Sequence, residues 1–194
     1  MSRSFLYTSR EGAPDGAPFL VFHDRYLLLQ DAEALAKVID DDAIRIAVQS
    51  PRAQSAGGSG ITKGYFWYIG PLNKPELSTL GDGLYQLELL IDETFERYGQ
   101  RKIGLYGTGE GGVIAMLAGL IFPDKVSAVV AIDAPFPTNI DQMPLEVRAL
   151  DGLPVLLSGE HAASAHDALT QRGALVTTAE TAPQPQAIAD FLRQ

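Results

Sequence analysis

The glycine-rich segment at residues 107–112 contains the residue types and spacing most suggestive of chemistry. Gly107, Gly109 and Gly112 satisfy the pattern G-x-G-x-x-G, after an apolar stretch typical of a buried strand and before one typical of a helix. In α/β proteins, a glycine turn between a strand and a helix either binds a phosphate at the helix N-terminus or presents a nucleophile. The segment therefore allows two different functions.

The first interpretation is a dinucleotide site. Asp133 lies at the end of the next predicted strand, where an acidic residue of such a fold binds the ribose of the cofactor. However, the fingerprint belongs to the first strand–helix–strand unit, whereas here more than half of the chain precedes Gly107. Only about a third of the chain follows Asp133, which is short for the remainder of that fold. The interpretation fits locally but poorly over the whole chain.

Composition excludes several other classes of function. The 194 residues carry a net charge of −9, and their 15 Lys and Arg residues are scattered, which argues against nucleic-acid binding. The chain has no cysteine, so it can form neither a disulfide nor a cysteine nucleophile. No histidine has a partner at metal-ligand spacing, so we expect no metal and no cofactor. No apolar run is long enough to cross a bilayer, and we expect a cytoplasmic protein with no membrane partner.

The elements that position these residues alternate between strand and helix. Apolar runs predict strands at residues 5–8, 18–22, 44–48, 102–106, 126–132, 154–158 and 174–178. Helical spacing and end signals predict helices at residues 31–39, 82–98, from the glycine turn to about 122, 163–171 and 186–192. This order predicts an α/β fold in one domain, residues 1–194, with a mainly parallel sheet, helices on both faces and no lid. Its ligand crevice would lie at the carboxyl ends of the strands.

Residues 52–81 are the least regular part of the sequence and are expected to form a long loop. Four consecutive aromatic residues, at positions 65–68, stand within it. They could pack against the body of the protein and hold the loop in place, or they could form the wall of an apolar pocket.

Several segments together resemble the small, lidless carboxylesterase/phospholipase family of the α/β-hydrolase superfamily. The resemblance lies in Pro18 to His23, which is similar to the strand before the family's oxyanion loop, in Pro51-Arg52 with the aromatic run, and in residues 122–131 and 153–159. Residues 107–112 align with the family's nucleophile elbow, G-x-S-x-G-G. The resemblance spans nearly the whole chain and implies a hydrolase scaffold with a Ser-His-Asp triad.

The triad implied by that resemblance is not present in the residues. Gly109 stands at the position of the serine, and residues 159–163 contain no aspartate at the position of the acid. The family's histidine position falls near Gln184, and no histidine follows His166. In the oxyanion loop Asp24 replaces a glycine, which puts negative charge where an oxyanion would be stabilised. Serine-hydrolase activity is therefore predicted to be absent.

Three residues are weak candidates for acid–base chemistry at the crevice: Glu110, His161 and Asp24. Two of them also have a structural interpretation, since Glu110 suits the first turn of a helix and His161 suits a solvated loop. Thr108 is next to Gly109, but an elbow directs that neighbour away from the site. The predicted crevice is lined by His23, Asp24, Tyr65, Trp67, Thr108, Gly109, Glu110 and His161.

These observations lead to one favoured function and two alternatives. The favoured function is a pseudoenzyme of the carboxylesterase type that binds a small molecule or a partner in the former active-site crevice. The alternatives are an enzyme with different acid–base chemistry on the same scaffold, and a dinucleotide-binding protein. The resemblance also implies that the chain could form a homodimer.

Overall fold

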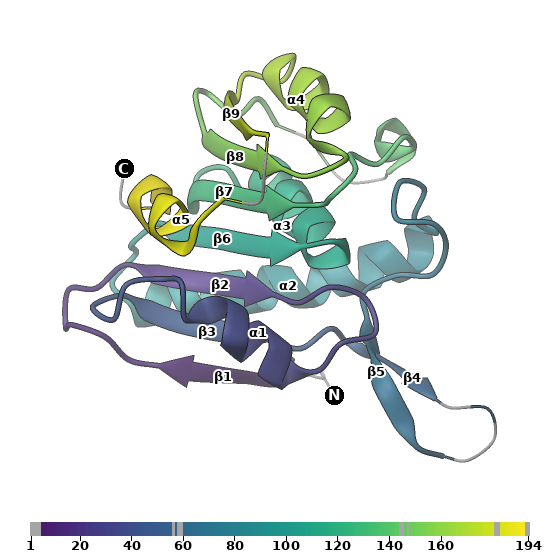
Figure 1. The fold of residues 1–194 in the computed structure, drawn as a ribbon, viewed down its shortest axis with the longest axis horizontal. Helices are drawn as coiled ribbons and strands as arrows, with labels where there is room; N and C mark the ends of the chain where they lie inside the picture. The colour runs from purple at the N-terminus through teal and green to yellow at the C-terminus, as the bar shows by residue number, and fades with distance from the viewer. Residues whose placement is uncertain are drawn as a thin grey trace.

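A seven-stranded sheet forms the centre of the protein. The computed structural model describes residues 5–55, 57, 60–143, 146, 148–180 and 183–192. The strands occur in the order β1-β3-β2-β6-β7-β8-β9 (Figure 1). Their bounds are β1 (Tyr7–Arg10), β2 (Pro18–Phe22), β3 (Ile44–Val48), β6 (Ile103–Thr108), β7 (Val126–Ile132), β8 (Pro154–Ser158) and β9 (Leu175–Ala179). The edge strand β1 runs antiparallel to β3 and the other pairs are parallel, which confirms the predicted α/β fold class.

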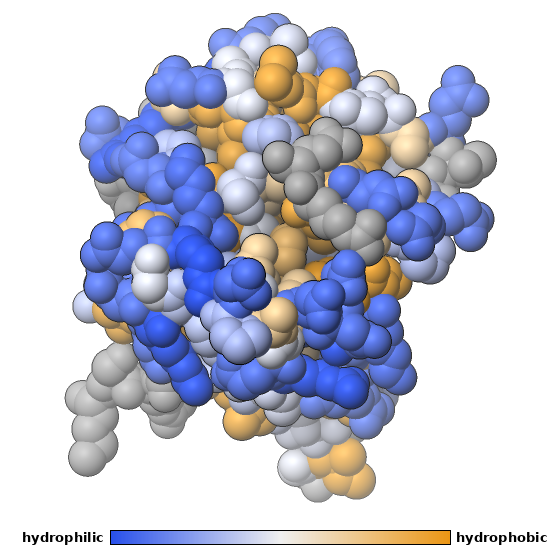
Figure 2. Space-filling model, turned by 90° about the vertical axis from the view of Figure 1, so that its left-hand side faces the viewer, coloured by the Kyte–Doolittle hydropathy of each residue, from blue (hydrophilic) through white to orange (hydrophobic). Residues whose placement is uncertain are grey.

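Helices cover both faces of this sheet. They are α1 (Leu29–Ala36), α2 (Leu77–Arg97), α3 (Glu110–Ile121), α4 (Ala162–Thr170) and α5 (Pro185–Leu192). Alternate residues of β2 divide the core between the two faces: Leu20 and Phe22 pack with α2, α3 and α4, whereas Phe19 and Val21 pack with α1 and α5. Figure 1 shows α1 and α5 on the near face and α2 and α3 behind the sheet. Figure 2 views the edge where the parallel strands begin, opposite their carboxyl ends.

The strand order places a switch point between β2 and β6. From β2 the chain passes outward to β3, and later returns to add β6 on the other side of β2. Ligand crevices of open α/β sheets form at such a point, beyond the carboxyl ends of the strands. Here those ends lead into residues 23–25 and 109–110. The fold therefore brings the predicted oxyanion loop next to the glycine turn.

Element boundaries were predicted most accurately for strands that are buried on both faces. The strands at 18–22, 44–48, 126–132 and 154–158 have the predicted bounds. The first strand lies two residues later than predicted, because Phe5 packs in the core instead of pairing in the sheet. In the second half of the chain, α4 and β9 are displaced by one residue, and α5 begins one residue earlier than predicted and ends at the predicted residue.

Two helix starts were predicted too late. The helix predicted from residue 31 begins at Leu29 and ends at Ala36, with the Asp31 carboxylate accepting the Leu28 N–H at 2.8 Å. The helix predicted from residue 82 begins at Leu77. Its cap is Glu76, whose carboxylate accepts the N–H groups of residues 78 and 79 at 3.0 and 2.8 Å. Glutamate is not a preferred N-cap, so the sequence carries a weak signal for this start.

The expectation of a loop throughout residues 52–81 was wrong. Strands β4 (Arg52–Ser55) and β5 (Thr62–Phe66) form an antiparallel hairpin that projects from the body of the molecule (Figure 1). Most of its side chains are exposed or half-buried, so the apolar alternation that signals a strand is missing. The sequence also predicts a Pro-rich loop from Pro135 to Pro144. The structure has a 3₁₀ turn, η1 (Ile140–Gln142), within this segment, and Pro144 lies outside the described residues.

None of the helices in the described part of the chain combines the length and the hydrophobicity needed to cross a membrane.

Candidate functional site

The glycine turn has the backbone geometry of a nucleophile elbow. Gly109 lies between β6 and α3 with φ of 52° and ψ of −120°, a conformation that side chains rarely tolerate. A Cβ on Gly107 would overlap the carbonyl of Gly111, so the turn also requires glycine where the strand approaches the helix. The predicted strand, turn and helix are confirmed. The apex residue, Gly109, has no side chain with which to react.

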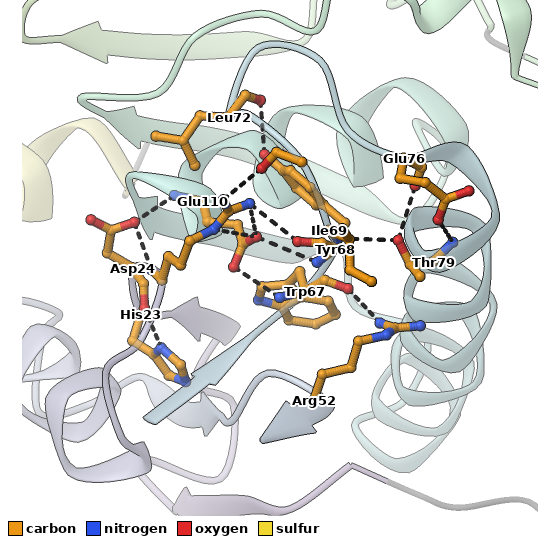
Figure 3. Close-up of polar contacts among 12 residues, drawn as sticks. His23, Asp24, Arg52, Trp67, Tyr68, Ile69, Leu72, Glu76, Thr79 and Glu110 are labelled. Atoms are coloured by element: carbon orange, nitrogen blue, oxygen red, sulfur yellow. Dashed lines mark hydrogen bonds and ion pairs between the residues drawn. The ribbon is translucent and has the colours of Figure 1, made fainter. Parts of the chain in front are cut away.

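The carboxylate of Asp24 occupies the space above this apex. A Cβ on Gly109 would overlap both carboxylate oxygens of Asp24. Oδ1 of Asp24 accepts two backbone N–H groups, from Arg25 at 2.6 Å and from Glu110 at 2.8 Å (Figure 3). Glu110 is also the first residue of α3, where the helix dipole favours negative charge. The Asp24 carboxylate is therefore bound as an internal anion.

The two donors to Asp24 have a defined role in serine hydrolases of this architecture. Their oxyanion hole uses the N–H of the residue after the nucleophile and an N–H from the loop after a neighbouring strand. Glu110 follows the apex, and Arg25 lies in the loop after β2. In this protein, both N–H groups are already hydrogen-bonded to Asp24.

The side chain of Glu110 is fully buried beneath the elbow. Its Oε1 accepts from Nη2 of Arg25 at 2.6 Å and from Nε at 3.0 Å, and its two oxygens accept the N–H groups of Trp67 and Tyr68 at 2.8 and 3.3 Å. Burial raises the pKa of Glu110, while these backbone N–H groups and the Arg25 guanidinium oppose the shift. Glu110 thus positions Arg25 and the aromatic segment and has no exposure to solvent.

Arg25 connects the two carboxylates. Its backbone N–H binds Asp24, and its guanidinium binds Glu110 and also the carbonyl oxygens of Gly70 at 2.6 Å and Tyr68 at 3.2 Å. The sequence analysis did not identify Arg25 as a site residue. Its only signal was its place as a cation directly after Asp24 in the predicted oxyanion loop.

His23 is a buried, neutral residue whose ring links the loop after β2 to the segment after β3 by hydrogen bonds. Its Nε2 accepts the Ser50 N–H at 3.2 Å, so Nδ1 carries the proton and donates to the Asp24 carbonyl at 2.7 Å. Burial lowers the pKa of His23, and the hydrogen bond to the Asp24 carbonyl partly offsets this effect. With no solvent exposure, His23 does not line an open crevice as predicted.

The aromatic run mainly packs in the core. Trp67 is fully buried, with ring centroids 5.0 Å from Phe5 and 5.7 Å from Phe22, and so does not form the predicted pocket wall. Tyr68 is also buried and donates its hydroxyl to the Leu72 carbonyl at 2.8 Å. Tyr65 is half-buried, and its backbone pairs with residues 26 and 27 at the base of the hairpin.

The remaining predicted residues lie further along the carboxyl edge of the sheet. Thr108 is half-buried at the end of β6, and His161 is half-buried at the N-terminus of α4, where its carbonyl accepts the Ala165 N–H at 3.2 Å. Asp133 is exposed and accepts the Glu160 N–H at 3.3 Å. Gln184 is exposed, and its carbonyl accepts from α5. Within the described part of the chain, no hydrogen bond or ion pair links His161 to Asp24 or Glu110.

A metal ion at this site would need several donor side chains close together. Within the described part of the chain, no group of three or more histidine or acidic side chains could hold an ion. The N-terminus of α3, where the G-x-G-x-x-G pattern would bind a pyrophosphate, already carries the Asp24 carboxylate.

Comparison of this geometry with known proteins identifies the fold. The structure is similar to a carboxylesterase from Bacillus cereus, at 15% identity and a TM-score of 0.75, over 97% of this chain and 93% of that one. It is also similar to a carboxylesterase from Mesorhizobium loti, at 16% identity and a TM-score of 0.76, over 97% and 94%. SOBER1 of Arabidopsis thaliana matches at 14% identity and a TM-score of 0.72, over 91% and 97%.

These similarities show that the chain has the α/β-hydrolase fold over nearly its full length, as the sequence resemblance implied. No protein-family model and no curated protein sequence matches it.

The buried ion pair predicts a large effect of Glu110→Gln on stability. The change leaves the Arg25 guanidinium, whose side chain is 17% exposed, without its charged partner. We expect the free energy of unfolding in urea to fall by about 3 kcal/mol. Asp124→Asn is the matched control, because its pair with Arg148 is largely exposed, and it should leave the urea midpoint nearly unchanged. Equal effects of the two variants would contradict the assigned role of Glu110.

The lowered pKa of His23 predicts a pH dependence of stability. Below about pH 6.5 the unfolded chain protonates this histidine, whereas the folded protein keeps it neutral until its lower pKa is reached. The unfolded state therefore binds more protons in that window, so stability falls as the pH falls, by at most about 1.4 kcal/mol per pH unit.

Urea unfolding between pH 7.5 and 5 would measure this slope. His23→Gln should reduce the slope, and His166→Gln, which changes a histidine with 38% side-chain exposure, should retain it. Identical slopes for the wild type and His23→Gln would show that His23 does not contribute.

Proposed function

We propose that this chain is a non-hydrolytic protein on the α/β-hydrolase fold, which binds a small molecule or a partner at the carboxyl edge of its sheet. The observation that carries the proposal is the Asp24 carboxylate, which is held over Gly109 by the N–H groups of Arg25 and Glu110. An ester carbonyl would need those same two donors to stabilise the oxyanion of acyl transfer.

The positions of the implied triad support the same conclusion. The apex of the elbow is Gly109, which offers no nucleophile. The turn after β8 carries Gly159 and Glu160 with no aspartate, and the segment before α5 carries Gln184 where a histidine would be required. A serine mechanism needs the nucleophile, its base and the group that orients the base to act together.

Asp24 would also change the kind of ligand that suits the carboxyl edge of the sheet. A hydrolase of this fold presents hydrogen-bond donors at the elbow, whereas this protein presents a carboxylate, an acceptor with negative charge. Asp133 and Glu160 add two exposed acidic side chains on the same edge of the sheet. A ligand group that donates hydrogen bonds and carries positive charge, such as an amine or a guanidinium, suits this edge.

The two alternative functions have weaker support. For acid–base chemistry, Glu110 is buried and engaged by Arg25 and two backbone N–H groups, and it does not face a substrate. For dinucleotide binding, the Asp24 carboxylate would repel a pyrophosphate at the N-terminus of α3.

Ligand preference tests the binding proposal directly. In ¹H–¹⁵N spectra, benzylamine should shift the amide signals of Arg25 and Glu110 saturably, and benzoate at the same ionic strength should not. Asp24→Asn should abolish the response to benzylamine, whereas Asp124→Asn, which removes a carboxylate elsewhere on the surface, should retain it. A preference for benzoate, or binding of benzylamine that survives Asp24→Asn, would refute the proposal.

The absence of hydrolysis can be tested with a fluorophosphonate label and short p-nitrophenyl esters, for which we expect neither labelling nor turnover. Gly109→Ser should also be inactive and should lower the free energy of unfolding by about 1–3 kcal/mol, because its side chain overlaps Asp24. The double variant Gly109→Ser/Asp24→Gly should lose less unfolding free energy than the two single variants lose when added together, because removing the Asp24 side chain removes the overlap. Ester hydrolysis by the wild-type chain at enzymatic rates would overturn this proposal.

A further inference from the structure

A cavity lies between α1 and the two strands β1 and β3. It has a volume of about 400 Å³ and is lined by Thr8, Ser9, Arg10, Glu33, Ala36, Lys37, Arg45 and Ala47. Three of these side chains are cations and one is an anion, in a chain whose net charge is −9. In Figure 2 hydrophilic residues cover much of the lower part of the molecule, where these strands lie.

The pairing of β1 with β3 places two of the cations opposite each other. Arg10 and Arg45 are direct partners in the antiparallel register, as are Thr8 and Ala47. Direct partners project their side chains from the same face of the sheet, and like charges in that arrangement repel each other. An anion between the two guanidinium groups would remove this repulsion.

Arg45 is buried more deeply than an ordinary surface arginine, with 7% of its side chain exposed. One of its terminal nitrogens binds Asp41 at 2.7 Å and the other donates to the Ile39 carbonyl at 3.3 Å. The Nε atom is buried without a hydrogen-bond partner among the described residues. A buried guanidinium donor left without an acceptor is costly, and a small displacement of the Arg45 side chain, which lines the cavity, would let a ligand oxygen accept this N–H.

The nearby acidic side chains do not supply an acceptor for the Arg45 Nε–H. The Glu33 carboxylate accepts the Thr8 hydroxyl at 2.8 Å, and among the described residues it forms no ion pair with Arg10 or Arg45. The Asp41 side chain is 88% exposed and contacts the outer end of the Arg45 guanidinium. Ala36 and Ala47 are small, which leaves room in the cavity beside the cations.

We propose that this cavity binds a small oxyanion, the phosphate or carboxylate group of a small molecule, through Arg10, Lys37 and Arg45. Arginine suits this role because its planar fork of N–H donors matches the oxygens of either group. The site uses none of the residues at the elbow, so this proposal can be correct or wrong independently of the function proposed above.

Inorganic phosphate and acetate are suitable probes, each titrated against sodium chloride at constant ionic strength. The readout is the ¹H–¹⁵N spectrum, including the Nε–Hε signals of the arginines. We expect the Arg45 Nε–Hε signal and the amide of Arg10 to shift saturably with at least one of the two anions. The tighter probe identifies whether a phosphate or a carboxylate is preferred.

Variants at the exposed cations make the test specific without relying on the buried Arg45. Arg10→Gln and Lys37→Gln should each weaken the apparent affinity at least about fivefold, which corresponds to about 1 kcal/mol. Lys63→Gln, at an exposed lysine on the β4–β5 hairpin, is the matched control and should leave the affinity unchanged. Shifts that grow linearly without saturation, or equal losses in all three variants, would show only general charge screening and would overturn the proposal.

Discussion

The ion pair between Arg25 and Glu110 holds together the centre of this protein. Glu110 is completely buried at the start of α3, and it gathers the Arg25 guanidinium together with the backbone N–H groups of Trp67 and Tyr68. Arg25 in turn binds carbonyl oxygens of the same segment and offers its own N–H to Asp24. The oxyanion loop, the aromatic segment and the elbow are therefore positioned by one connected set of polar contacts, each of which compensates for the burial of another.

This arrangement explains how the scaffold accommodates a carboxylate at the elbow. Asp24 brings negative charge to the N-terminus of α3, where two N–H groups and the helix dipole favour it, and Gly109 leaves the space that its carboxylate fills. Serine at position 109 and aspartate at position 24 would compete for the same volume. The two departures from the hydrolase pattern are thus physically coupled: once Asp24 occupies the elbow, glycine is the residue that fits at the apex.

The sequence-based predictions were accurate for elements with a strong local pattern of apolar residues and inaccurate for elements without one. Strands such as β2 and β7 are buried runs of apolar residues, and their bounds were predicted without error. The hairpin β4–β5 was missed because its exposed, polar strands carry no alternation, and the start of α2 was missed because its cap is Glu76. For the aromatic run the sequence left both core packing and a pocket wall open, because its composition is the same in either setting, and Trp67, which was placed in the crevice, is a core residue.

The sequence by itself determined the α/β architecture, the conformation of the glycine turn and the unusual identities of Asp24 and Gly109. These follow from apolar periodicity, from the need for glycine at positive φ and from residue types at positions along the chain. Only the tertiary structure decided which contacts those residues make. Asp24 reaches Gly109 because β2 and β6 are neighbours in the sheet, and Arg10 faces Arg45 because β1 pairs with β3 in one register. Contacts between residues so distant in sequence depend on strand order and register, which local patterns do not encode.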